Sequence, residues 1–161
     1  MGAVVCSVEG RQENVDQIKL NYPDLIAICA NLDTPNWTWG SWDVIINFGL
    51  HYHLTNFHQE HLSNCLLNSD LMFFETVIFD NNQPTIYYKN ETGNDQALKI
   101  NAGTPSTSYV ENILISYKVD FKKYSDSKLN GNNHHYDWID RKSNIHDGFA
   151  RRFWIINKRL K

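Results

Sequence analysis

Hydrophobic residues are gathered in short apolar runs that alternate with segments of helical periodicity. The runs are rich in β-branched residues, which is typical of strands buried on both faces, and they lie at 3–8, 25–30, 43–48 and 71–79. Further strands are predicted over 119–124 and 149–157, and the polar segment 80–105 is predicted to be one long loop.

Apolar residues three or four positions apart predict three helices: one between the first and second runs, one between the third and fourth, and one after the polar segment. Each begins at capping-box spacing, at Asn14 with Gln17, at Asn56 with Gln59 and at Ser108 with Glu111. Strands that alternate with helices predict an α/β fold. We expect a Rossmann-like open, mostly parallel twisted sheet with helices on both faces and an antiparallel strand near the C-terminus.

Composition narrows the class of protein. The 161 residues, 42% of them hydrophobic, suit a single domain over 1–161. The net charge of −3 supplies no cationic field, so we do not expect nucleic-acid binding. Three scattered cysteines predict no disulfide framework, and no apolar run is long enough to cross a membrane. We therefore expect a cytoplasmic protein.

In open α/β sheets, ligands bind beyond the carboxyl ends of the strands. The loops after Glu9, Ala30, Phe48 and Phe79 are therefore expected to carry the chemistry.

Three ordered segments carry a resemblance to a known family. They are GAVVCSVEGRQENV at 2–15, WDVIINFGLHYHL at 42–54 and LMFFETVIFD at 71–80. In this order and spacing the chain resembles class I S-adenosylmethionine-dependent methyltransferases, especially a subgroup with a strand ending in G-L-x-Y-H-L. Segments 94–114, 129–138 and 151–155 are similar to the C-terminal half of that subgroup.

The resemblance implies that S-adenosylmethionine is the cofactor and that Glu9 accepts hydrogen bonds from its ribose hydroxyls. A carboxylate suits a cis-diol, although a solvated strand end is an equally weighted alternative for Glu9. Asn31 stands where the family usually has an acid that meets the adenine amino group, and Leu32 would pack on the adenine. The implied cofactor set is completed by residues at two strand ends, Gly10, Asn47, Phe48 and Gly49.

The glycine-rich turn that ends the first strand of this family does not occur in the sequence. Relative to the family pattern, the first strand, this turn and the following helix are missing, so the domain is N-terminally truncated in comparison. Our hypothesis is that the sheet closes by direct pairing of neighbouring strands or by another subunit in a homo-oligomer.

Two residues after the 43–48 strand are candidates for catalysis. The strand ends beside the transferred methyl group in this family, so Tyr52 and His53 would orient the acceptor or take its proton. The alternative is that His53 caps the loop and Tyr52 packs beneath it. Glu75 interrupts an apolar strand, and it either faces the acceptor or pairs with Arg151 or Arg152.

Four histidines, His51, His53, His58 and His61, lie close together in the sequence. If the strand continues, His51 and His53 point the same way, and His58 and His61 are one helical turn apart. No zinc signature has this spacing, and the run coincides with the family turn and an exposed helix start. We therefore assign no metal ligand, and keep a metal-dependent hydrolase as a rival class.

The polar and aromatic loops near the C-terminus are expected to hold the substrate, through Asp80, His135, Tyr136, Trp138 and Arg152. The alternative for Trp138 is an anchor between a lid and the core. The predicted function is S-adenosylmethionine-dependent methyl transfer to a small-molecule or sugar-like acceptor. The alternative is a catalytically silent, methyltransferase-like binding or assembly module.

Overall fold

The computed structural model describes residues 2–35, 37, 40–79, 81–91, 97–131, 136 and 149–158. Within these ranges, the fold begins with two parallel strands. Strand β1 (Cys6–Glu9) is followed by helix α1 (Gln12–Asn21) and by β2 (Ile26–Cys29), which pairs with β1 in parallel. This is the strand–helix–strand unit that the apolar runs predict.

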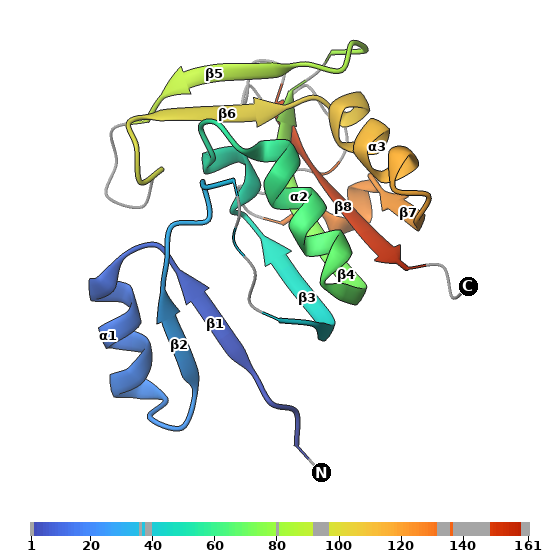
Figure 1. Ribbon diagram of the computed structural model, residues 1–161. Helices are drawn as coiled ribbons and strands as arrows, with labels where there is room; N and C mark the ends of the chain where they lie inside the picture. The colour runs from blue at the N-terminus through green and yellow to red at the C-terminus, as the bar shows by residue number, and fades with distance from the viewer. Residues whose placement is uncertain are drawn as a thin grey trace.

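A four-stranded sheet with the order β3-β4-β8-β7 forms the larger part of the molecule (Figure 1). Strands β3 (Trp42–Phe48) and β4 (Ser69–Phe79) are parallel. They are joined by the short 3-10 helix η1 (His51–His53) and by α2 (His58–Leu67). Strand β8 (Phe149–Asn157) runs antiparallel between β4 and β7 (Asp120–Tyr124), and the 3-10 helix η2 (Ser127–Leu129) follows β7. The mixed α/β fold and its antiparallel strand near the C-terminus are confirmed.

The hydrophobic core lies between this sheet and helices α2 and α3 (Thr107–Ser116). Side chains alternate along a strand, so every second residue of β4 and β8 faces the helices. Phe74 and Trp154 are fully buried with ring centroids 5.4 Å apart, and Leu62 and Leu114 pack there from the two helices.

The predicted long loop over 80–105 is wrong. Strands β5 (Ile86–Asn90) and β6 (Asn101–Pro105) form an antiparallel pair within it. Few apolar residues mark these strands, because β6 is buried through small side chains such as Ala102 and Thr104. Gly103 lies so close to His58 that a Cβ there would meet the ring at 2.5 Å.

None of the three predicted capping boxes caps its helix. Helix α1 begins before Asn14, and Arg11 at its N-cap makes no side-chain capping bond. At the start of α2 the capping group comes from a distant residue, because Oδ1 of Asp33 accepts hydrogen bonds from the backbone N–H groups of Asn56 and Phe57. Helix α3 is capped by Ser106, whose Oγ accepts from the Tyr109 N–H, rather than by Ser108.

Strands β1 and β3 each have one edge without a strand partner among the described residues, since β1 pairs only with β2 and β3 only with β4. The expected direct pairing of these neighbours does not occur in that part of the chain. Exposed apolar side chains accompany both edges: Val4 is 77% and Ile46 is 67% exposed. No helix within the described ranges is long and apolar enough to cross a membrane.

Candidate active site at the end of β3

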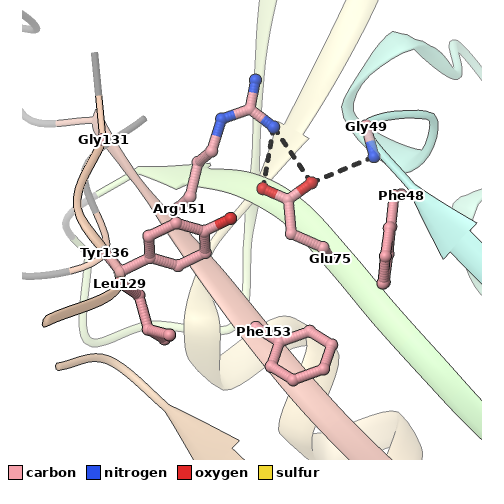
Figure 2. Close-up of a pocket in the computed structure, with 8 residues that line it drawn as sticks. All are labelled: Phe48, Gly49, Glu75, Leu129, Gly131, Tyr136, Arg151 and Phe153. Carbon is pink, nitrogen blue, oxygen red and sulfur yellow. Dashed lines mark hydrogen bonds and ion pairs between the residues drawn. The ribbon is translucent and has the colours of Figure 1, made fainter. Parts of the chain in front are cut away.

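A cavity of about 640 Å³ opens where β3 ends. Figure 2 shows the side chains around it, which come from β3, β4, β8 and the segment after β7. Most of the wall is apolar or aromatic, and the charged pair Glu75 and Arg151 supplies the polar part. The lining residues are Phe48, Gly49, Glu75, Leu129, Gly131, Tyr136, Arg151 and Phe153.

Glu75 and Arg151 form an ion pair that brings charge to this cavity. Nη1 of Arg151 donates to Oε1 of Glu75 at 2.7 Å and to Oε2 at 2.9 Å. Oε2 also accepts from the backbone N–H of Gly49 at 3.0 Å. Gly49 has a φ of +68°, a backbone conformation that glycine adopts without strain. The turn after β3 therefore presents its N–H to the carboxylate that interrupts β4.

Burial and local charges shift the pKa of two lining residues. Burial acts to lower the pKa of Arg151, but the hydrogen bonds and the charge of Glu75 outweigh it and raise the pKa. Burial raises the pKa of Tyr136, and the negative charge of Glu75 adds to that effect. At neutral pH the cavity therefore holds a charged guanidinium beside a neutral phenol.

Tyr52 and His53 lie in η1, directly after β3, with their rings 4.0 Å apart between centroids. The Tyr52 ring lies 5.6 Å from the Arg151 guanidinium, and its hydroxyl accepts from Nη2 of Arg151 at 3.5 Å. On its other side, His53 contacts Glu91, with Nδ1 2.7 Å from Oε2. A continuous series of contacts thus runs from Glu91 to Glu75.

The implied cofactor residues Glu9, Gly10, Asn31 and Leu32 lie at the carboxyl ends of β1 and β2. Oε1 of Glu9 accepts from the Arg11 N–H at 3.0 Å, and the side chain is partly exposed. Oδ1 of Asn31 accepts from the Asp33 N–H at 2.9 Å. Leu98 packs on Gly10, so that a Cβ there would meet a methyl group at 2.6 Å.

The other three implied cofactor residues divide between the cavity and the core. Phe48 and Gly49 line the cavity. Asn47 points to the opposite side of β3, where its Nδ2 donates to Nε2 of His61 at 2.7 Å, and its side chain is buried. The structure therefore separates Asn47 from its two neighbours.

Three of the four clustered histidines are core residues. The expected strand arrangement of His51 and His53 is wrong, because η1 is helical, and the expected exposed helix start is wrong, because His58 and His61 are buried. The His51 ring lies 5.3 Å from that of His58 and 5.7 Å from that of His61. Within the described ranges, no group of three His, Cys, Asp or Glu residues has an arrangement that could hold a metal ion.

Burial keeps these histidines neutral. Burial, with a smaller contribution from the neighbouring histidine rings, lowers the pKa of His51 well below the ordinary value and that of His61 to about 4. Burial also lowers the pKa of His58, although its Nε2–H donates to the Gly103 carbonyl at 2.7 Å.

Of the two predicted substrate residues that the structure describes, Tyr136 lines the cavity and Arg152 does not. Arg152 is buried and donates to the backbone carbonyls of Tyr136 and Arg151. Asp80, His135 and Trp138 lie outside the described residues. Sequence reasoning missed Phe153 and Glu91. Phe153 could have been predicted, because side chains alternate along β8 and therefore put it on the same side as Arg151. Glu91 could not, because it follows β5, a strand that the polar sequence of this segment did not predict.

Comparison with known proteins identifies the type of fold that this chain has. No protein-family model matches the chain, and no curated protein matches it. The N-terminal domain of EvdMO1 with SAH bound is 13% identical, with a TM-score of 0.67, over 99% of this chain and 66% of that one. The same domain in the presence of SAH and D-fucose is 13% identical, with a TM-score of 0.67, over 99% of this chain and 67% of that one.

An S-adenosylmethionine-dependent methyltransferase from Mesorhizobium loti is 10% identical, with a TM-score of 0.64, over 97% of this chain and 82% of that one. The chain therefore has the Rossmann-like fold of class I S-adenosylmethionine-dependent methyltransferases. It spans about two thirds of the length of the EvdMO1 domain.

Proposed function

We propose that this chain supports S-adenosylmethionine-dependent methyl transfer to a small, sugar-like acceptor. The observation that carries the proposal is the cavity at the end of β3, which combines aromatic walls with the Glu75–Arg151 pair. Aromatic faces suit the apolar side of a sugar ring, and a carboxylate and a guanidinium suit its hydroxyl groups. The presence of SAH and D-fucose with the similar EvdMO1 domain supports this choice of acceptor.

The residues at the ends of β1 and β2 fit the adenosine part of the cofactor. One oxygen of Glu9 is bonded to the Arg11 N–H, so the other oxygen is the natural acceptor for a ribose hydroxyl. Leu32 offers a partly exposed apolar side chain beside the exposed Asn31. When bound, S-adenosylmethionine supplies an electrophilic methyl group on a sulfonium sulfur, which keeps the electron pair of the broken bond.

The chain's own residues would mainly position the acceptor. Alignment of an acceptor oxygen with a reactive carbon accounts for a large part of the rate in such transfers. Phe48 and Phe153 would hold the ring of the acceptor, and Arg151 and Glu75 would fix its hydroxyl groups. His53 would then accept the proton that the reacting hydroxyl loses.

The experiment is a transfer assay with radiolabelled methyl on S-adenosylmethionine and D-fucose as the first acceptor. Label should appear in the sugar with the unmodified chain and fall by tenfold or more with Phe153→Ala. Phe121→Ala is the matched control, because Phe121 lies on β7 and packs against the core. Transfer that is absent, or that is unchanged by Phe153→Ala, contradicts the proposal.

A second candidate function, an assembly module, is favoured by the edges of β1 and β3. Both edges lack a strand partner within the described residues, and exposed apolar side chains such as Val5 and Ile46 accompany them. An unpaired, apolar edge is a template for pairing with another chain. We propose a second copy of this chain as the partner, since each copy brings the same edges and could extend the sheet of the other.

Light scattering after size-exclusion chromatography tests this second candidate. The unmodified chain should have twice the monomer mass, and Ile46→Lys should have the monomer mass. Ile115→Lys is the matched control, because Ile115 is 62% exposed on α3, away from both edges. A monomeric unmodified chain, or a dimer that Ile46→Lys leaves intact, contradicts the assembly function.

A further inference from the structure

Glu91 contacts the one histidine of the cluster that is not buried in the core. Its Oε2 lies 2.7 Å from Nδ1 of His53, and its side chain is 3% exposed, whereas that of His53 is 17% exposed. The carboxylate is thus the inner member of the pair and the imidazole the outer one. We propose that Glu91 is a positioning residue that holds His53 in the form that accepts a proton at Nε2. This inference rests on the proposed methyl transfer.

The pairing determines which nitrogen of His53 carries the proton. An ionised carboxylate has only acceptor atoms, so Nδ1 of a neutral His53 must be the N–H donor. The lone pair of that imidazole then lies on Nε2, at the other side of the ring. When Nε2 takes a proton, the imidazolium is stabilised by the negative charge of Glu91 directly behind it.

Glu91 is itself held in place by several contacts. Oε2 also accepts from the Ala97 N–H at 3.2 Å, and Oε1 lies 3.4 Å from Nζ of Lys89. The backbone N–H of Glu91 donates to the Ile100 carbonyl at 2.6 Å. A carboxylate fixed in this way does not have to reorganise when charge develops on its partner, which is the property of an effective electrostatic stabiliser.

His53 is fixed on its other sides and connected to the cavity. Its N–H donates to the Leu50 carbonyl at 2.9 Å, and its ring packs on Tyr52. Tyr52 in turn contacts Arg151, which lines the cavity. One side chain therefore separates the His53 ring from a cavity-lining group.

The proton balance of this step is simple. The O–H bond of the acceptor breaks, its electron pair stays on the oxygen that forms the new bond to carbon, and the proton goes to Nε2 of His53. The positive charge that leaves the sulfonium appears as an imidazolium beside Glu91. Solvent then removes the proton, because His53 is partly exposed.

Nitrogen-15 NMR of the imidazole rings tests the pairing without any need for activity. At pH 8 the unmodified chain should show His53 with its proton on Nδ1. Glu91→Gln keeps an acceptor oxygen and should keep this form, whereas Glu91→Ala should change it to the Nε2–H form. Glu13→Gln, on the exposed side of α1, is the control and should change nothing. A proton on Nε2 in the unmodified chain overturns the inference.

The kcat of the Glu91 variants provides the second readout. Glu91→Ala releases the Nδ1 proton and should lower kcat by up to about a hundredfold, the usual contribution of a positioned general base, whereas Glu91→Gln keeps the Nδ1–H form and should restore part of that loss. SAH binding, measured by calorimetry for each variant, should be unchanged. If the unmodified chain binds SAH and transfers methyl but Glu91→Ala lowers kcat no more than Glu91→Gln does, this inference fails while the proposed function stands. If SAH does not bind at all, the proposed function fails, and the NMR result alone decides on the pairing.

Discussion

Glu75 and Arg151 face one another from neighbouring strands, and one guanidinium nitrogen, Nη1, lies within 2.9 Å of both carboxylate oxygens. β4 and β8 are antiparallel, with Val77 opposite Arg151, so the arginine reaches diagonally across the sheet to the carboxylate two residues away. The carboxylate that interrupts the apolar pattern of β4 therefore has its charge partner within the cavity wall.

The stability of the chain should depend on this pair. Arg151→Met leaves the buried carboxylate without its charge partner and should lower the free energy of unfolding by about 3 kcal/mol. Urea unfolding at pH 7 measures the loss. In the double variant Glu75→Gln with Arg151→Met most of the loss should be recovered, because no unpaired charge remains. Losses that simply add in the double variant would show that the pairing is not the cause.

The buried histidines predict a loss of stability between pH 6.5 and pH 4. Their folded-state pKa values lie below the ordinary 6.5, with that of His61 at about 4, so the unfolded chain binds protons that the folded chain does not. Stability is therefore full above pH 6.5 and falls as the pH drops through this window, by up to about 1.4 kcal/mol per pH unit for each histidine. Asp33, whose pKa is lowered from 3.8, acts below the window. Urea unfolding at pH 7 and pH 5 measures the difference.

His51→Phe should reduce that pH dependence. Neither ring nitrogen of His51 has a hydrogen-bond partner among the described residues, so a phenyl ring loses no bond seen there and keeps the edge contact with Phe74. We expect unchanged or higher stability at pH 7 and a shallower fall toward pH 5. A fall as steep as that of the unmodified chain would mean that His51 is not one of the titrating groups.

Capping of α2 by Asp33 predicts a further effect on stability. Asp33→Ala removes the acceptor for the Asn56 and Phe57 N–H groups and should cost about 1–2 kcal/mol. Thermal unfolding provides the measurement. Asp24→Ala, at an exposed position between α1 and β2, is the matched control and should change the stability little. Equal effects of the two substitutions would rule out long-range capping.

Gly103→Ala should destabilise the contact between β6 and α2. Its Cβ would lie 2.5 Å from a ring carbon of His58 and 2.8 Å from a methyl of Ile86, and such overpacking costs about 1–3 kcal/mol. Gly2→Ala is the control, since nothing lies within 4 Å of its added Cβ. Equal melting temperatures for the two variants would contradict the packing described for His58.

The sequence predicts strands where burial depends on large apolar residues and fails where it does not. Strands β3 and β4 follow from their apolar runs, whereas β6 is buried through Ala102, Gly103 and Thr104, which no hydrophobic pattern marks. The capping of α2 by Asp33 joins residues more than twenty positions apart, so local spacing cannot reveal it. The exposed start predicted for α2 failed for a related reason, since β6 covers His58.

The candidate site was predicted in part. Tyr52, His53 and Glu75 lie along one series of contacts, and the alternative of a pair between Glu75 and Arg151 is the arrangement found. Glu91 could not be assigned, because its contact with His53 depends on the β5–β6 pair. Arg152 was predicted beside the substrate, but alternation along β8 turns it away from the side of Arg151.

Calorimetric titration of the purified chain with S-adenosylhomocysteine tests the central claim most directly. The account predicts micromolar binding that is at least tenfold weaker in Glu9→Ala and unchanged in Glu13→Ala, whose side chain lies exposed on α1. Absence of binding, or equal binding by all three proteins, would contradict a cofactor site at the ends of β1 and β2.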